Sequence, residues 1–376
     1  MKKLNIVYLA LSERYGENHA GFSHVYNITK NLGLYCDKVD VFFKNNNIGL
    51  IEKNSNVKYH GVILPNVKNI FRIFKYIKSY SYIKNVINNA DIVHERFHVN
   101  PIDLLFVKKK YYILEINDPA LVLYNGLKGW IYKKLIYKKL KIADKIITQT
   151  QTLKNILSKY TNKKIFVVSN GVDTKLFNPK IKSNVRKLYN IRNDEIVVCF
   201  SGGFMQWHGI QDVPKLASEF KDIKFLLIGT GPLYEEIKEE TKLLKNIILT
   251  GPIKYSDVSK YLAAADILIA PFNTSRFKHL EKYGFWWCPV KIFEYMAVGK
   301  PIISYDYVEV RKIMKNTGLL AKPGNLEDFK NKLRTLINNK ELRHEYGRKA
   351  RILSLKYEWK KRAEEINEVY NETIKS

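Results

Sequence analysis

The sequence of 376 residues has little cysteine and no long apolar run. Cys36, Cys199 and Cys288 are odd in number and far apart, which argues against a disulfide framework and against a zinc site. Such sparse cysteine fits a reducing cytosol. The longest apolar stretches fall well short of the roughly 18 to 20 residues of a membrane-spanning helix. The sequence therefore predicts a soluble or peripherally attached protein.

Acidic residues are also scarce, because 36 Asp and Glu face 64 Lys and Arg and give a formal net charge of +28. No Asp-x-Asp motif occurs, so nothing visible requires a bound metal. Between Glu52 and Asp91 there is no carboxylate at all. The segment 66–83 in this region is basic and amphipathic, which is typical of helices on anionic membrane surfaces. It is equally typical of a crossover helix that packs its apolar side on a sheet.

Short β-branched or aromatic runs alternate with longer amphipathic stretches, and the alternation restarts after residue 194. This pattern is typical of right-handed βαβ units around a parallel sheet. The sequence therefore predicts an α/β fold with two Rossmann-like domains. The expected strands are 4–10, 38–43, 58–64, 91–94, 111–116, 145–149 and 165–169, and then 196–200, 224–228, 246–249, 266–270 and 301–304.

Domain boundaries follow from the same pattern. We expect a first domain over 1–177, a polar and basic linker over 178–194, and a second domain over 195–357. A long charged helix over 358–376 comes after the last predicted strand, and we expect it to pack back on the first domain.

Three glycine-bearing turns follow predicted strands, at the sheet edge where open α/β folds bind ligands. They are "ENHAGFSHV" around Gly21, "FSGGFMQWHGI" with Gly202 and Gly203, and "LLIGTGPLYEEI" with Gly229 and Gly231. Glycine lets a backbone approach a phosphate closely, and the N-terminus of the following helix offers unpaired N–H groups. Together the turns indicate a phosphate-containing ligand.

One short helix can be predicted from its ends, within "CPVKIFEYMAVGKPIIS" at 288–304. Pro289 suits a first helical turn, Gly299 can take a left-handed cap, and Pro301 cannot continue a helix. Residues 302–304 then have the apolar character of a buried strand. Glu294 therefore lies on a short helix that leads into a sheet.

At this point the chain resembles a known family, the retaining glycosyltransferases of family 4 with two Rossmann-like domains (GT-B), also called glycosyl transferases group 1. The matching stretches are "VVSNGVDTKLFNP" (167–179), "LLIGTGPLYEEI" (226–237), "ILTGPIKYSDVSKYLAAADILIAPF" (248–272), "PVKIFEYMAVGKPIIS" (289–304) and "YEWKKRAEEINEVY" (357–370). "GFSHVYNITKNLG" (21–33) resembles the family's opening loop and helix. The order and spacing agree over most of the chain.

The resemblance implies that Glu294 accepts hydrogen bonds from the ribose hydroxyls of a sugar nucleotide, and a carboxylate suits a diol. Lys291 lies one turn earlier on the same helix face, and we hypothesise that it meets a phosphate. Both are candidate catalytic residues. The other candidate donor-binding residues are Gly21, Gly203, His208, Gly231 and Ile253.

The chain departs from the family pattern at several positions. Trp286 stands where many members carry a second glutamate, and Gly203 and His208 stand in the loop that holds an Arg and a Lys in the family. A histidine is fully charged only below its pKa, near 6.5 when unperturbed. Asn117, the third candidate catalytic residue, replaces a histidine close to the transferred sugar, and an amide cannot serve as a general base.

The acceptor side is less defined by the sequence. Glu95, Arg96 and His98 are candidates to line it, and they are equally interpretable as structural polar residues at a strand end. The basic segments 66–83 and 128–145 fall in the half that handles the acceptor in the family. They favour a glycan or lipid-linked acceptor and an anionic membrane surface.

We therefore predict a cytoplasmic enzyme, peripheral on the inner face of the membrane if the basic segments bind lipid. It would transfer a hexose from a UDP- or GDP-sugar to an acceptor hydroxyl with retention, without a cofactor or metal. Two alternatives stay open: a sugar-nucleotide epimerase on the same scaffold, and a nucleic-acid-binding protein suggested by a pI of about 9.7. No recognised nucleic-acid module is present, so a nucleic-acid partner is not expected.

Overall fold

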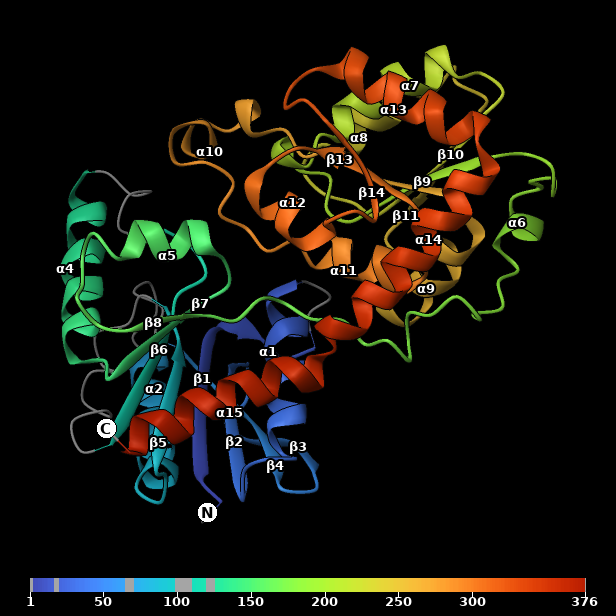
Figure 1. Ribbon diagram of the computed structural model, residues 1–376. Helices are drawn as coiled ribbons and strands as arrows, with labels where there is room; N and C mark the ends of the chain where they lie inside the picture. Colours follow the sequence, from blue (N-terminus) through green and yellow to red (C-terminus); the bar gives the residue numbers. More distant parts are fainter. Residues whose placement is uncertain (1–2, 17–19, 65–70, 99–109, 120–125, 376) are drawn as a thin grey trace. The chain divides into compact units, whose positions relative to one another are not determined.

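The computed structural model describes residues 3–16, 20–64, 71–98, 110–119 and 126–375, and these form two compact units (Figure 1). The first unit comprises residues 1–170 and 359–376, and the second comprises residues 171–358. Each unit contains one sheet with helices packed against it. No described helix is both long and apolar enough to cross a bilayer.

The first unit is built on a sheet with the order β3-β4-β2-β1-β5-β6-β7-β8. All neighbouring pairs are parallel except β3 and β4. The strands are β1 (Asn5–Arg14), β2 (Lys38–Lys44), β3 (Gly49–Asn54), β4 (Val57–Val62), β5 (Ile92–Arg96), β6 (Tyr111–Glu115), β7 (Lys145–Thr148) and β8 (Ile165–Val167).

The terminal helix α15 (Trp359–Lys375) belongs to the first unit, where it packs beside α1 (Ala20–Leu32) on one face of the sheet. Trp359, Ile366 and Tyr370 of α15 share a buried cluster with Ile6 and Tyr8 of β1. Burial of this apolar stripe explains why the long charged helix lies on the first sheet. The other described helices of the unit are α2 (Phe71–Ile87), α4 (Gly126–Ile142) and α5 (Gln151–Leu157).

The second unit is built on a fully parallel sheet with the order β11-β10-β9-β12-β13-β14. Apolar clusters cover both of its faces, as a doubly wound fold requires. The strands are β9 (Val197–Ser201), β10 (Lys224–Ile228), β11 (Ile247–Gly251), β12 (Ile267–Ala270), β13 (Ile302–Tyr305) and β14 (Gly318–Ala321). The helices are α6 (Val185–Leu188), α7 (Val213–Glu219), α8 (Tyr234–Glu240), α9 (Tyr255–Ala264), α10 (Lys278–Tyr283), α11 (Val290–Ala297), α12 (Val308–Met314), α13 (Leu326–Asn338) and α14 (Lys340–Ser354).

The boundary between the units differs from the expected one. It lies at residue 170, and the stretch 178–194 is packed within the second unit instead of serving as a linker. Val185 and Ile191 of this stretch are buried in the second core, and Arg186 forms an ion pair of 2.7 Å with Asp266. The polar composition of the stretch concealed these apolar anchors.

The helix α11 has the predicted ends. Pro289 is its N-cap, Gly299 has φ +71° just past its C-terminus, and β13 follows after Pro301. The strong stop explains how an eight-residue helix keeps a fixed length between a turn and a buried strand.

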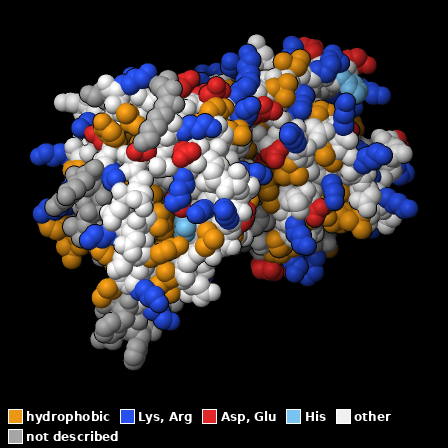
Figure 2. All heavy atoms as spheres, turned by 90° about the horizontal axis from the view of Figure 1, so that it is seen from below, with side chains coloured by type: hydrophobic (Ala, Val, Ile, Leu, Met, Phe, Trp, Pro, Cys, Tyr) orange, Lys and Arg blue, Asp and Glu red, His pale blue; other side chains and the backbone are white. Residues whose placement is uncertain are grey.

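Surface charge is widely distributed. Lys and Arg side chains are scattered over the face seen in Figure 2, with fewer Asp and Glu among them. On this face the excess of base does not gather into a single stripe.

Candidate active site

In the second unit, the predicted donor-binding residues lie at the carboxyl ends of neighbouring strands. Gly203 follows β9, Gly231 follows β10 and Ile253 follows β11, and these strands are adjacent in the sheet. Ile253 is half-buried and packs on the core of the unit. Lys291 and Glu294 lie on α11, which contacts β12 and β13. The sequence thus places five candidates at the edge where parallel sheets bind ligands.

The turns after β9 and β10 are too close for side chains at three glycines. A Cβ atom on Gly202, where φ is +130°, would lie 2.7 Å from Nζ of Lys291. A Cβ atom on Gly229 would collide with the carbonyl oxygen of Gly202, and one on Gly231 would lie 2.8 Å from the backbone nitrogen of Phe204. The turn after β9 therefore presents backbone, rather than a side chain, to Lys291, and the turn after β10 packs closely against the turn after β9.

Lys291 is buried, and its ammonium group has no hydrogen-bond partner among the described residues. Nζ lies 4.2 Å from the centroid of the Phe200 ring and 5.4 Å from that of Phe272. Burial lowers the pKa of Lys291 to about 7, against the opposing effect of the Glu294 carboxylate. A buried charge without a counter-ion is costly. The site is therefore arranged for an anion.

Glu294 lies one turn after this lysine on α11. Burial raises the pKa of Glu294 to about 7, although a hydrogen bond from Tyr255 and the charge of Lys291 oppose the shift. The Tyr255 hydroxyl donates to Oε1 at 2.9 Å. A carboxylate has about four acceptor sites. Glu294 therefore keeps capacity for the hydroxyls of a ligand.

His208 is held as a neutral ring. Its Nδ1 atom lies 2.6 Å from the carbonyl oxygen of Gly203 and must carry the proton, because a carbonyl only accepts. Burial, and secondarily the charge of Lys291, lower the pKa of His208 to about 3. The neutral ring therefore offers Nε2 as an acceptor and cannot donate from it to a phosphate. Donor binding by His208 stays a prediction, with accepting as its expected role.

Trp286 provides no substitute for the glutamate found at that position in many family members. It is buried, and its ring centroid lies 5.7 Å from that of Trp287. This part of the second unit is an aromatic cluster rather than a polar one.

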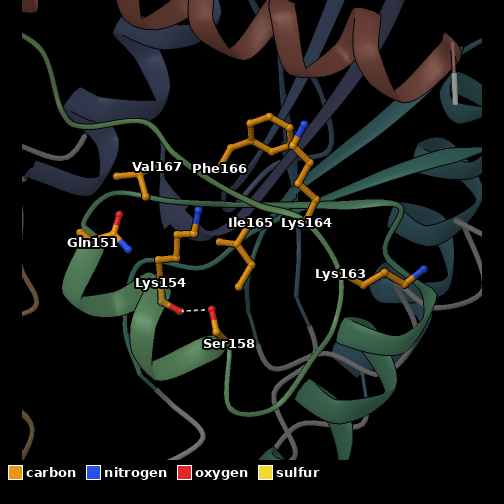
Figure 3. A pocket seen from close by; sticks show the side chains of 8 residues that line it. All are labelled: Gln151, Lys154, Ser158, Lys163, Lys164, Ile165, Phe166 and Val167. Carbon is orange, nitrogen blue, oxygen red and sulfur yellow. Dashed lines mark hydrogen bonds between the residues drawn. The ribbon is translucent and has the colours of Figure 1, made fainter.

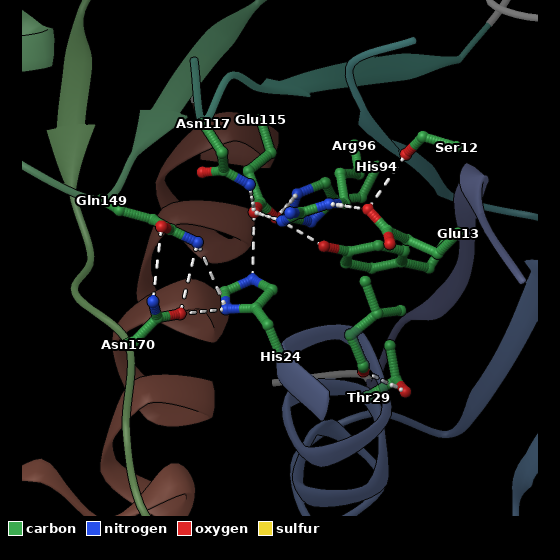
Figure 4. A network of polar contacts seen from close by, with 12 residues as sticks. Ser12, Glu13, His24, Thr29, His94, Arg96, Glu115, Asn117, Gln149 and Asn170 are labelled. Carbon is green, nitrogen blue, oxygen red and sulfur yellow. Dashed lines mark hydrogen bonds and ion pairs between the residues drawn. The ribbon is translucent and has the colours of Figure 1, made fainter. Parts of the chain in front are cut away.

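In the first unit, a buried carboxylate gathers polar side chains from several elements (Figure 4). Oε1 of Glu115, the last residue of β6, lies 3.0 Å from Nε2 of His24 on α1 and 3.1 Å from Nη1 of Arg96 on β5. Asn117 donates to the same oxygen from Nδ2 at 2.5 Å. Thus two residues predicted from the sequence, Arg96 and Asn117, meet at a residue that was not predicted.

The second oxygen of Glu115 is also occupied. The Tyr8 hydroxyl donates to Oε2, and Nε2 of His94 lies 3.2 Å away. Burial alone would raise the pKa of Glu115, but the contacts with the two histidines and with Arg96 hold it well below its usual range. Glu115 is therefore ionised at neutral pH.

Gly21 lies at the edge of this Glu115 network. Glu13 lies 2.9 Å from Nε of Arg96, and a Cβ atom on Gly21 would collide with the Glu13 carboxylate. A side chain at position 21 would therefore have to displace the Glu13 carboxylate, and the contact of Gly21 with the donor stays a prediction.

Glu95 and His98 lie together elsewhere in the first unit. Nζ of Lys139, on α4, donates to Oε1 of Glu95 at 2.5 Å and to the carbonyl oxygen of His98 at 3.0 Å. The Tyr112 hydroxyl donates to the other oxygen of Glu95 at 2.7 Å. These contacts are internal to the protein, so an acceptor-side role for Glu95 and His98 stays a prediction.

A pocket of about 490 Å³ opens on the first unit between α5 and β8 (Figure 3). It contains none of the predicted site residues. One of its three lysines, Lys164, already pairs with Glu372 at 2.8 Å. Its lining residues are Gln151, Lys154, Ser158, Lys163, Lys164, Ile165, Phe166 and Val167.

Sequence reasoning missed the residues that hold the predicted ones, notably Glu115, His24 and Tyr255. An acidic residue at the end of the apolar strand "YYILE" was a usable signal, because buried carboxylates need partners. His24 follows the glycine turn on the first helix, at a position that also faces the sheet edge. Tyr255 carried no comparable signal. Among the described residues, no group of His, Cys, Asp and Glu side chains could hold a metal ion.

Two units, each with a wholly or mostly parallel sheet covered by helices, have the GT-B fold of glycosyltransferases, and solved structures share this fold. Sucrose-phosphate synthase from Thermosynechococcus elongatus matches 99% of this chain and 99% of its own, with a TM-score of 0.80 and 15% identity. Anabaena HepE in complex with UDP and glucose matches 98% of this chain and 100% of its own, with a TM-score of 0.71 and 14% identity.

Sequence comparisons point to the same family. The model of glycosyl transferases group 1 matches residues 195–339. The uncharacterized glycosyltransferase MJ1178 of Methanocaldococcus jannaschii is 29% identical over 331 residues, which cover 84% of this chain and 86% of that protein. Residues 195–339 thus resemble the group 1 glycosyltransferases, the family that the motifs predicted, and the relative over most of the chain is a glycosyltransferase. This similarity favours glycosyl transfer over the epimerase and nucleic-acid alternatives.

Proposed function

We propose that this glycosyltransferase uses a nucleoside diphosphate sugar, with UDP or GDP as the nucleotide, and transfers its hexose to a hydroxyl of a glycan or lipid-linked acceptor with retention. The observation that carries the proposal is the buried, unpaired ammonium group of Lys291 beside the Glu294 carboxylate. The complex of HepE with UDP and glucose supports a nucleotide of this kind.

In this proposal the two residues of α11 have different roles. Glu294 accepts hydrogen bonds from the ribose hydroxyls, while Lys291 and the N–H groups of the glycine turns bind the diphosphate. Negative charge builds on the diphosphate as the bond to the sugar breaks, and preorganised donors stabilise such charge most effectively in a buried site. Lys291 is therefore the main catalytic cation.

Retention follows from a front-face route in which the sugar passes through an oxocarbenium-like state. The family resemblance implies that the leaving phosphate takes the proton of the acceptor hydroxyl. The proposed reaction needs no metal, because Lys291 supplies the positive charge on the diphosphate.

Thermal shift with UDP, GDP and ADP tests donor binding, since a ligand stabilises the state that it binds. We expect one nucleotide diphosphate to raise the Tm, and Glu294→Ala to abolish that rise. NMR of the donor sugar without acceptor then separates transfer from epimerisation. Unchanged nucleotide affinity in Glu294→Ala and Lys291→Met would refute the proposed site.

We also propose that α4 docks the enzyme on the anionic inner face of the cell membrane. One face of this helix exposes Leu127 (76% exposed), Trp130 (54%), Ile131, Tyr137 and Ile142. Nζ of Lys134 lies 3.7 Å from the centroid of the Trp130 ring. The helix has lysines and no acidic residue, and such a face suits anionic headgroups. For the segment 66–83, the side chains of residues 66–74 lie outside the described residues.

Sedimentation with vesicles of mixed anionic and neutral lipids tests this surface. We expect binding at low salt that weakens as salt is added, and a loss of about tenfold in Leu127→Ser/Trp130→Ser. Leu243→Ser is the matched control, because Leu243 is 89% exposed in the second unit. Equal binding by both variants, or none by the natural chain, would overturn the surface proposal without touching the donor site.

A further inference from the structure

The Glu294 carboxylate is held at one of its two oxygens. The Tyr255 hydroxyl donates to Oε1 at 2.9 Å, and no group of the described residues donates to Oε2. A glutamate side chain has several rotatable bonds, so an unanchored one samples many orientations. The two oxygens belong to one planar group, and an anchored Oε1 therefore also restricts where Oε2 can point.

Packing holds Tyr255 in place. It is the first residue of α9, and its ring centroid lies 5.6 Å from that of Phe177, which is fully buried. The Tyr255 ring packs on the apolar core of the second unit. A tyrosine of this kind combines an apolar body with one polar end. Its hydroxyl group is thus fixed in the position from which it reaches Glu294.

The support of Tyr255 and the helix of Glu294 are tied to the same side chain. Nη1 of Arg351, on α14, donates at 3.1 Å to the carbonyl oxygen of Phe177 and at 3.1 Å to that of Ala297, the last residue of α11. All of these residues belong to the second unit. The contact between Tyr255 and Glu294 is therefore set within one compact unit.

The hydrogen bond also affects the charge of Glu294. Burial raises the pKa of Glu294 to about 7, and the hydrogen bond from Tyr255 and the charge of Lys291 oppose that rise. Tyr295, on the same helix, interacts electrostatically with Glu294 but stays neutral, because burial raises its pKa. Loss of the Tyr255 hydroxyl would raise the pKa of Glu294 further, since hydrogen bonds to a carboxylate favour its charged form.

We propose that Tyr255 is a positioning residue of the donor site, which fixes Oε1 of Glu294 and thereby aims Oε2 at a hydroxyl group of the nucleotide. The proposal rests on the proposed function, because it assumes that Glu294 binds the nucleotide. The carboxylate is then oriented before the nucleotide arrives, so binding does not lose affinity by ordering it. Tyr255 acts through Glu294 and needs no contact of its own with the nucleotide.

Tyr255→Phe tests this role, because it removes the hydroxyl and keeps the ring beside Phe177. Calorimetry with UDP, GDP and ADP in turn measures the affinity. For a nucleotide that binds the natural chain, we expect the Kd of the variant to be about tenfold higher at pH 7, the size of one hydrogen bond to a charged group.

Tyr261→Phe is the matched control for the loss of a hydroxyl group. Tyr261 lies on the same helix, but its ring is beside Tyr189, with the centroids 6.3 Å apart. We expect this control to bind the nucleotide as tightly as the natural chain does.

The pH dependence gives a readout that a loss of packing would not change. Without the Tyr255 hydroxyl, Glu294 ionises at a higher pH, so the variant should bind worst, relative to the natural chain, on the acidic side of pH 7. We expect the ratio of the two Kd values to be about threefold larger at pH 6 than at pH 8.

Glu294→Gln provides the sharper background, because a glutamine cannot ionise. In this background Tyr255→Phe should raise the Kd by only about threefold, and equally at pH 6 and pH 8, since a neutral hydrogen bond is weaker than one to a charge. The comparison of single and double variants isolates the coupling between the two side chains. A structural role of Tyr255 would instead give the same penalty in both backgrounds.

The outcomes separate the two proposals. If no nucleotide binds the natural chain, the proposed function fails. If a nucleotide binds, but Tyr255→Phe binds it as tightly at every pH or loses the same factor in both backgrounds, only the role of Tyr255 is overturned. Should Tyr255→Phe lower the Tm, the comparison of backgrounds still decides, because both carry the same loss of stability.

Discussion

The two units bury charge in opposite ways. In the first unit, every oxygen of Glu115 is occupied by donors of the protein itself, and its pKa lies well below the usual range. In the second unit, Lys291 and Glu294 are buried with few partners, and their pKa values move toward neutrality to about 7. A saturated charge maintains the local structure, whereas an unsaturated one is ready for a ligand.

The largest effect that separates the units is on stability. Glu115→Ala should lower the free energy of unfolding by about 3–5 kcal/mol, since it leaves the buried Arg96 and both histidines without their anion. The folded pKa of Glu115 is depressed, so its stabilisation is complete above the unfolded pKa near 4.5 and is lost as the pH falls toward the folded value. Urea unfolding of the natural chain and of Glu115→Ala at pH 7 and pH 4 measures the loss of unfolding free energy and its dependence on pH. A loss below 1 kcal/mol would contradict the saturated-charge interpretation.

Lys291→Met should have the opposite effect on stability and a large effect on activity. Removing an unpaired buried ammonium group should raise the free energy of unfolding by about 1–3 kcal/mol. The gain is largest below pH 7, where the folded lysine is charged, and it shrinks as the pH rises through the folded pKa of about 7.

The same variant should lose about 10²- to 10³-fold in kcat/KM, the usual cost of removing one donor to a developing negative charge. Thermal unfolding and steady-state kinetics check the two effects. Lys330→Met is a matched control, because Lys330 forms ion pairs with Glu219 and Glu327 in the same unit. A less stable Lys291→Met variant would show that the lysine is structural.

The sequence predicts the parallel strands because most of them are short, buried apolar runs. It misses β3 and β14, whose side chains are less buried. β3 (Gly49–Asn54) is an edge strand whose side chains are mostly exposed, and β14 (Gly318–Ala321) is only partly buried. Pairing with a neighbour, rather than burial, defines such strands. A single sequence does not show that pairing.

The candidate site divides in a similar way. The placement of Glu294 and Lys291 on one short helix was predictable, because the helix ends and family motifs around them are local in the sequence. The partners of Asn117 were not, because Glu115 draws on Tyr8, His24 and His94, which only the sheet order β1-β5-β6 brings together. Long-range contacts of this kind depend on topology rather than on sequence spacing.

The pH dependence of nucleotide affinity sharpens the comparison further. In the proposed site Glu294 loses a proton to accept from ribose, so nucleotide affinity should rise up to about pH 7. Lys291 keeps its proton to bind phosphate there, so affinity should fall above pH 7. Each limb approaches tenfold per pH unit.

Calorimetry with the preferred nucleotide diphosphate between pH 5.5 and 8.5 measures this bell-shaped dependence of affinity on pH. Glu294→Gln should remove only the acidic limb, and Lys291→Met only the alkaline one. Glu115→Gln should leave the pH profile of affinity unchanged, because the carboxylate that it replaces does not titrate in this range. A flat profile in the natural chain would show that the α11 pair is not titrating.

The smallest effect on kcat/KM is expected at His208. This residue lies in the second unit, but the protein already satisfies its hydrogen-bond donor, as it satisfies the charge of Glu115 in the first unit. Its Nδ1–H is already bonded to Gly203, and its pKa of about 3 keeps it neutral throughout the assay range. His208→Gln retains an acceptor, so kcat/KM should fall only about threefold and the pH profile should keep its shape. If the variant instead lost 10²-fold or more, as expected for Lys291→Met, the ring would have to be charged in the bound state, with a proton taken up from solution when the diphosphate arrives.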